Sequence, residues 1–192
     1  PPFGWWIAAV VAFAGLGWLL TVPSVTAKGG FGYGLLFGLA FYGPLLPWIS
    51  GLVGPVPWLA LSAVEALLPA LFGLAAVLVR KVPGWPLWFA GLWSAQEWLK
   101  STVPFGGFPW GVVGYSQTQS PALPLAYLGG APLVSFGVAL VGFGLAAMTI
   151  ETVRWWRSDR ATRAAAPPAV VLPGLCVAIV LLTAALAWPH VR

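Results

Sequence analysis

The sequence predicts an all-α protein, a polytopic bundle of transmembrane helices. Of its 192 residues, 60% are hydrophobic and only 7% are charged, and the mean hydropathy is +0.92. A water-soluble domain of this size carries about a quarter charged residues, so 7% is too few to cover a surface in water. The apolar residues also fall into long runs separated by polar or Gly/Pro-rich segments, which is typical of membrane-spanning helices.

Six of these runs are candidate spans, since a spanning helix needs about 20 apolar residues. The first run is short. The second is interrupted by Pro44 and Pro47, and the third contains Glu65 and ends at Arg80. The fourth is also short, and the last two flank an arginine-rich segment. The runs cover residues 5–20, 31–50, 56–79, 85–99, 132–150 and 170–188.

Small residues are frequent throughout these runs. The chain has 24 glycines and many alanines. In lipid, helices associate through close packing, and small residues let their backbones approach each other. We therefore expect the Gly/Ala-rich helix faces to serve packing rather than binding.

The basic residues divide unequally between alternate connections. One set of connections holds most of them, whereas the other holds only Lys100 and Arg192. The positive-inside rule then predicts that residues 151–168 form a cytoplasmic loop and residues 100–131 an extracytoplasmic loop. We expect the arginines of the first loop to hold it against anionic lipid rather than to form a catalytic site. The first set comprises Lys28, Arg80, Lys81, Arg154, Arg157, Arg160 and Arg163.

The polar segment between the fourth and fifth runs is the strongest candidate for a functional site. Residues 96–117 read QEWLKSTVPFGGFPWGVVGYSQ. Polar side chains and irregular backbone are costly inside a bilayer unless they lie at an interface or line a cavity. The segment is therefore either a water-facing cap on the bundle or part of a site.

Each candidate residue has a structural and a functional interpretation. Glu97 and Lys100 are three residues apart and could form an ion pair at a helix end, with Lys100 snorkelling to the headgroups. Alternatively, Lys100 contacts a lipid phosphate, or Glu97 orients the following loop. Trp110 and Tyr115 suit an ordinary aromatic belt or this polar site. Trp48, beside a proline, suits an interface anchor or the wall of an opening between helices.

Other reactive residues give weaker signals. Glu65, inside the third run, is either a structural hydrogen-bonding group near Ser62 or part of a proton path. It has no basic partner in any predicted span, and no internal repeat supports a transporter. Cys176 lies in the last run, where a thiol is inert, and His190 is the single histidine. With no metal-ligand spacing and no phosphate loop, we expect no metal, no cofactor and no nucleic-acid partner.

Three motifs in the polar segment follow one another at characteristic spacing. They are QEWLK at residues 96–100, GFPW at 107–110 and GYSQ at 114–117, followed by a proline-rich turn that leads to VSF at 134–136. In this order they resemble the apolipoprotein N-acyltransferase family of bacterial inner membranes. The arginine-rich loop and the alanine-rich composition are similar to actinobacterial members.

The resemblance implies an acyltransferase in the bacterial cytoplasmic membrane. Such an enzyme moves an acyl chain from a phospholipid to the α-amino group of the N-terminal diacylglyceryl-cysteine of a lipoprotein. Its Glu-Lys-Cys triad lies in a nitrilase-like domain, which we expect after residue 192. We therefore expect residues 1–192 to be the membrane domain, inactive alone, which admits and positions both lipid substrates. Residues expected to line or support that opening are Trp48, Glu97, Lys100, Phe108, Pro109, Trp110 and Tyr115.

A second hypothesis is that the bundle is an anchor or scaffold. Some actinobacterial proteins that resemble this family are fused to a polyprenol-phosphate mannose synthase, a glycosyltransferase. The membrane part would then tether that mannosyltransferase instead of admitting lipid substrates.

Overall fold

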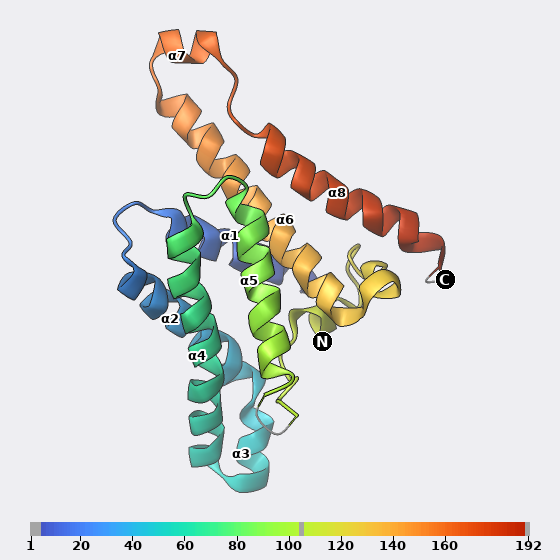
Figure 1. The fold of residues 1–192 in the computed structure, drawn as a ribbon. Coiled ribbons are helices and arrows are strands. Elements are labelled where there is room, and N and C mark those ends of the chain that lie inside the picture. Colours follow the sequence, from blue (N-terminus) through green and yellow to red (C-terminus); the bar gives the residue numbers. More distant parts are fainter. Residues whose placement is uncertain (1–4, 104–105, 191–192) are drawn as a thin grey trace. The chain divides into compact units, whose positions relative to one another are not determined.

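A computed structural model describes residues 5–103 and 106–190, and within these residues it contains helices and no strand (Figure 1). Arg192 and two residues of the polar segment, 104 and 105, lie outside the described residues. The all-α prediction is confirmed. The elements are α1 (Trp6–Thr21), α2 (Ala27–Leu45), α3 (Pro47–Val53), α4 (Pro55–Val79), α5 (Trp85–Lys100), η1 (Val113–Gln117), α6 (Leu125–Arg157), α7 (Arg160–Ala165), α8 (Val171–Ala187) and η2 (Trp188–His190).

The predicted number of six spanning helices was too high. Among the described residues, α4, α6 and the α8–η2 stretch are long and apolar enough to cross a membrane. Helices α2 and α3 add a fourth if they count as one span with a bend of 57°. Helices α1 and α5 have 16 residues each, which gives a length of about 24 Å, shorter than a hydrocarbon core of about 30 Å.

The chain forms two compact units. Unit 1 comprises residues 1–18, 83–90 and 113–192, and unit 2 comprises residues 19–82 and 91–112. Helices α1 and α5 therefore each contribute one part to unit 1 and another to unit 2.

Unit 2 is built on the pair formed by α2 and α4 (Figure 1). Gly30, Gly34 and Gly38 are spaced four apart, so they lie on one face of α2, and all three are buried. A Cβ added at Gly38 would lie 2.7 Å from the Cα of Ala66, and one at Gly34 would collide with the backbone of Pro69. The predicted use of small residues for helix packing is confirmed at this face.

The end of α4 is tied to the connection between α1 and α2 by one guanidinium group. Nη1 of Arg80 donates to the carbonyl oxygens of Leu20, Val22 and Val25 at 2.8–3.2 Å, and Nη2 donates to Pro23 at 3.1 Å. Carbonyls at the end of a helix have no partner within that helix, so the side chain satisfies groups that would otherwise need water.

We predict that Arg80→Met lowers the free energy of unfolding by about 2 kcal/mol, because hydrogen bonds to charged groups contribute about 1.5–3 kcal/mol. Thermal unfolding in detergent measures the effect. The neighbouring Lys81 is exposed, so Lys81→Met serves as the matched control and should change stability by less than about 0.5 kcal/mol. Equal effects of the two substitutions would contradict the role given to Arg80.

The core of unit 1 is aromatic. The Phe143 ring of α6 lies 5.3 Å from the rings of Phe13 and Phe89, and Trp85 lies 4.7 Å from Phe89. Gly142 and Gly144 allow close approach of α1 and α8 to α6, respectively. Phe143 thus joins α6 to the portions of α1 and α5 that belong to this unit.

Helix α6 is longer than its predicted span. It begins at Leu125, bends at Gly129 and Gly130, and continues to Arg157. Gly130 has a φ of +64°, a conformation that glycine adopts at little cost. The first seven residues of segment 151–168 are therefore helical, and α7 adds six more.

Candidate functional site

The end of α5 carries the side chain of Lys100 into the core of unit 2. Lys100 is only 2% exposed, and its Nζ atom donates to the Tyr42 hydroxyl and to the Trp110 carbonyl, each at 2.7 Å. Nζ also lies 4.9 Å from the centroid of the Tyr42 ring. The snorkelling interpretation of Lys100 is therefore wrong for this structure, because the amine points into the unit rather than toward headgroups.

Two buried acids belong to the same cluster. Glu97 accepts a hydrogen bond from Nε1 of Trp93 at 3.0 Å, and Lys100 interacts electrostatically with both Glu97 and Glu65. Glu65 is buried in α4, and its carboxylate oxygen Oε2 has no hydrogen-bond partner among the described residues. Ser62 bonds to the Tyr42 carbonyl at 3.5 Å. A buried charge persists only near groups of opposite charge or hydrogen-bond partners.

Two glycines fold the segment after α5 back onto it. Gly107 has a φ of +77° and Gly111 a φ of +78°, which favour glycine. Gly107 packs against the backbone of Ser101 and Thr102, and the amide of the next residue, Phe108, donates to the Lys100 carbonyl at 2.7 Å. The backbone of residues 107–111 is thus held by contacts that leave no space for a side chain at Gly107.

The other end of this segment lies against α2. A Cβ at Gly111 would lie 2.8 Å from Leu45 and 2.9 Å from the Tyr42 ring. Phe108 packs on the buried cluster of Tyr42, Leu46 and Ile49, whereas Pro109 is exposed. The Lys100–Trp110 hydrogen bond then fixes the point at which the segment leaves the core.

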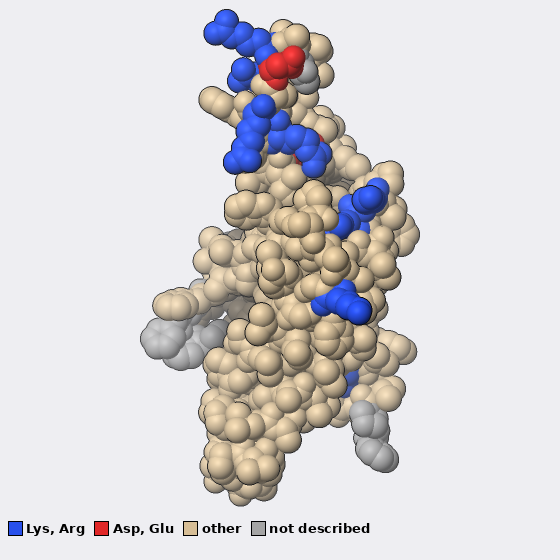
Figure 2. Space-filling view, turned by 90° about the vertical axis from the view of Figure 1, so that its left-hand side faces the viewer, with Lys and Arg blue, Asp and Glu red and all other residues tan. Residues whose placement is uncertain are grey.

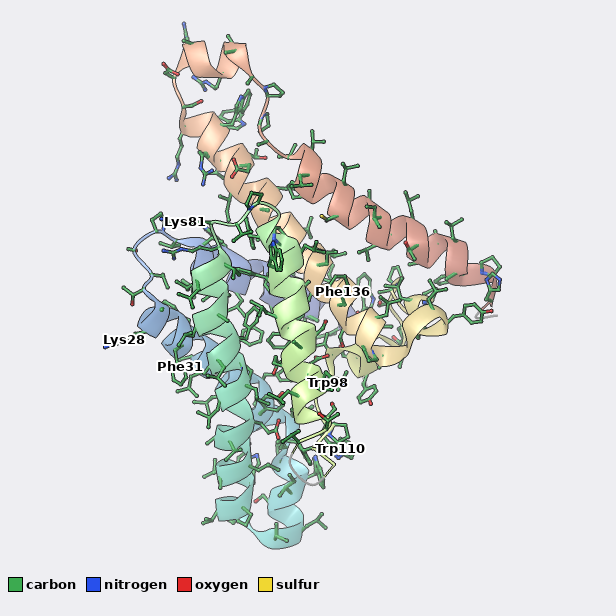
Figure 3. All side chains as sticks on the ribbon, viewed as in Figure 1. Lys28, Phe31, Lys81, Trp98, Trp110 and Phe136 are labelled. Atoms are coloured by element: carbon green, nitrogen blue, oxygen red, sulfur yellow. The ribbon has the colours of Figure 1, made fainter. Side chains whose placement is uncertain are left out.

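Two tryptophans meet at the surface beside the segment of residues 107–111. Trp48, the second residue of α3, and Trp110 have ring centroids 5.2 Å apart, and they are 45% and 54% exposed. Figure 3 shows Trp110 beside α3. Residues 47–59, which include all of α3 and the start of α4, contain no charged residue, and several of their apolar side chains are exposed. These are Leu52, Val53, Val56 and Leu59.

Unit 2 brings together six of the seven predicted site residues. Glu97 and Lys100 form the buried part, Phe108 the partly buried part, and Trp48, Pro109 and Trp110 the surface. The seventh, Tyr115, is exposed on η1 and belongs to unit 1.

Sequence reasoning missed Tyr42. It lies within an apolar run and is 58 residues from Lys100 in the chain, so neither hydropathy nor local spacing indicates the contact. The available signal is chemical: a buried tyrosine hydroxyl usually requires a polar partner. Tyr42 accepts a hydrogen bond from Nζ of Lys100 and lies against Gly111. It therefore joins α2 both to the end of α5 and to the segment that follows α5.

The cluster joins buried polar side chains to an exposed aromatic surface. The described residues of the chain contain no group of three His, Cys, Asp or Glu side chains that could hold a metal ion. Cys176 belongs to α8 of unit 1 and is partly buried. What unit 2 presents is a hydrogen-bonded backbone segment and two exposed tryptophan rings.

The sequence of the polar segment and the rest of the first 144 residues match a known family. The family model described as the apolipoprotein N-acyltransferase N-terminal domain aligns with residues 1–144. The chain belongs to the apolipoprotein N-acyltransferase family. The resemblance inferred from the three motifs is confirmed. Members of this family are named as N-acyltransferases that act on apolipoproteins.

Three relatives illustrate the range of similarity, and each is named apolipoprotein N-acyltransferase. The protein of Mycolicibacterium smegmatis is 62% identical over all 192 residues, which make up 32% of that relative. The protein of Chromobacterium violaceum is 38% identical over 65% of the chain and 26% of its own length. That of Methylococcus capsulatus is 34% identical over 90% of the chain and 35% of its own length.

This chain therefore spans about a third of the length of these relatives. The actinobacterial character predicted from composition agrees with the similarity to Mycolicibacterium. The relatives are named for acyl transfer and not for mannosyl transfer, so the scaffold hypothesis gains no support from them.

Proposed function

We propose that this chain is the membrane domain of an apolipoprotein N-acyltransferase and that it positions lipid substrates for acyl transfer. The acyl donor is a phospholipid, and the acceptor is the α-amino group of the diacylglyceryl-cysteine of a lipoprotein. The chemistry itself takes place in another part of the protein, and this chain alone is inactive. The protein is a multi-pass component of the bacterial cytoplasmic membrane.

The observation that carries this proposal is the tryptophan pair held above Lys100. Tryptophan rings are amphipathic and favour the level of the lipid headgroups. Trp110 is fixed through its carbonyl by Lys100, and its ring lies against Trp48. A rigid aromatic surface of this kind orders an acyl chain or headgroup at lower entropic cost than a mobile loop does.

The arrangement of basic residues supports an extracytoplasmic position for this surface. Lys100 bonds to Tyr42 near the C-terminal end of α2, whereas Arg80 bonds to carbonyls that precede the N-terminus of α2. Lys100 and Arg80 therefore lie at opposite ends of the α2–α4 pair. Lys28 and Lys81 are close in sequence to the Arg80 end, so the positive-inside rule favours the cytoplasm for that end.

We predict that Trp48→Ala and Trp110→Ala each lower kcat/KM for acyl transfer about tenfold in the native-length enzyme, because truncation of a central tryptophan at a binding surface typically costs more than 1 kcal/mol. The loss should appear mainly in KM. A purified diacylglyceryl lipopeptide and phospholipid vesicles provide the assay.

Trp88→Ala is the matched control, because Trp88 is 52% exposed and belongs to unit 1. It should leave kcat/KM within about twofold of the unsubstituted enzyme, as expected of a surface substitution outside the site. Unchanged acyl transfer in both Trp48→Ala and Trp110→Ala, with normal thermal unfolding, would refute the proposed role of the pair.

A further inference from the structure

A separate groove lies on unit 1 where α6 ends. Its volume is about 540 Å³, and it is lined by Trp18 of α1 together with Ile150, Val153, Arg154 and Arg157 of α6. Most of its exposed wall is apolar. The two arginines belong to the last turn of α6, which precedes α7 in the chain. None of these residues belongs to the tryptophan surface of unit 2.

The surroundings of the groove carry excess positive charge. Figure 2 shows Lys and Arg side chains gathered around the α7 end of unit 1. Residues 151–163 contain four arginines and two acids. Glu151 accepts a hydrogen bond from Arg154 at 2.7 Å, and four arginines less two acids leave the segment with a net charge of +2. An occupant with negative charge would therefore be favoured over a neutral one.

The position of the groove at the end of α6 and its apolar lining restrict the kind of molecule that can occupy it. Helix α6 is long and apolar enough to cross a membrane, and Arg154 and Arg157 occupy its last turn. Basic side chains at this position lie at the headgroup level, while Trp18, Ile150 and Val153 extend an apolar wall. A small soluble anion would use the arginines but not that wall.

We propose that this groove binds an anionic phospholipid. Arg154 and Arg157 contact its phosphate, and the part of an acyl chain next to the headgroup lies along Trp18, Ile150 and Val153. The lipid is a bound component of the membrane domain and is distinct from the acyl donor. The site lies in the leaflet at the C-terminal end of α6, which the charge distribution assigns to the cytoplasmic side.

Native mass spectrometry of the purified native-length protein tests this inference. The protein is exchanged into mixed vesicles or detergent with equal amounts of phosphatidylglycerol and phosphatidylcholine of identical acyl chains, and retained lipid is counted. The unsubstituted protein should retain phosphatidylglycerol preferentially. The double variant Arg154→Gln/Arg157→Gln should reduce this preference about tenfold, since each basic residue near an anionic surface contributes several-fold in affinity.

Two comparisons separate the groove from general surface charge. Arg160→Gln/Arg163→Gln removes the same charge from α7, outside the groove, and should leave most of the preference. Val153→Trp fills the apolar part of the groove without changing the charge of the protein, and it should lower retention of phosphatidylglycerol. This variant tests the site even if the arginine substitutions impair folding.

Equal retention of the two lipids by the unsubstituted protein would overturn the proposal. So would equal losses in the two arginine double variants, because the preference would then follow net charge rather than the groove. Because acyl transfer by the Trp48 and Trp110 variants is measured independently, failure of this inference leaves the proposed function intact.

Discussion

Lys100→Met is expected to lower the free energy of unfolding by about 3–5 kcal/mol, the usual effect of removing one partner from a buried charged cluster. Methionine retains much of the apolar stem but cannot donate to the Tyr42 hydroxyl or the Trp110 carbonyl. It also removes a buried positive charge that interacts electrostatically with Glu97 and Glu65. Chemical denaturation in detergent measures the loss.

The same substitution should abolish most acyl transfer in the native-length enzyme, even at temperatures at which the variant is folded. The physical reason is that residues 107–111 lose their attachment to the core, so Trp110 no longer has a fixed position. Tyr42→Phe provides a graded comparison, since it removes one hydrogen bond to a charged group and should cost about 1.5–3 kcal/mol. Normal stability and full activity of Lys100→Met would exclude Lys100 as the centre of the site.

Gly34→Leu is expected to prevent the close pairing of α2 and α4. Even a single Cβ at Gly34 would collide with the backbone of Pro69, and backbone cannot rotate away as a side chain can. Gly34→Ala should therefore cost about 1–3 kcal/mol, the usual range for overpacking, and the leucine variant should cost more. Thermal unfolding of the purified protein in detergent orders the two variants.

Gly32→Ala is the matched control on the same helix. Among the described residues, no heavy atom outside its own helix backbone and chain neighbours lies within 4 Å of the place that a Cβ would take at Gly32. Alanine there should stabilise the protein by about 0.5–1 kcal/mol, because glycine loses more backbone entropy in a helix. Destabilisation of similar size at Gly32 and Gly34 would show that helix propensity, not contact with α4, determines the effect.

Hydropathy locates the helices well but overestimates the number that can span. The third apolar run covers residues 56–79 and α4 covers Pro55–Val79; the sixth run covers 170–188 and α8 covers Val171–Ala187. Such runs are local properties of the sequence, so their positions follow directly from composition. The span count also requires length, and 16 residues in α1 and α5 are too few.

The candidate site could be predicted in its members but not in its geometry. The motifs at residues 96–110 point to Glu97, Lys100, Phe108, Pro109 and Trp110, which unit 2 gathers. The burial of Lys100 could not be inferred, because it depends on Tyr42 and Glu65, two residues of other helices that are distant in sequence. Local spacing predicts neighbours on one helix and gives no information about which helices pack together.

Cysteine accessibility in intact cells tests most directly whether the Lys100 site faces the extracytoplasmic side. In a native-length protein in which Cys176 and every other native cysteine are replaced by alanine, single cysteines replace Val103, which is exposed after α5, and Ala161, which is exposed on α7. A membrane-impermeant maleimide should label position 103 in intact spheroplasts and position 161 only after permeabilisation. Labelling of position 161 and protection of position 103 in intact spheroplasts would contradict the proposed orientation and, with it, the presentation of lipid substrates by the tryptophan pair.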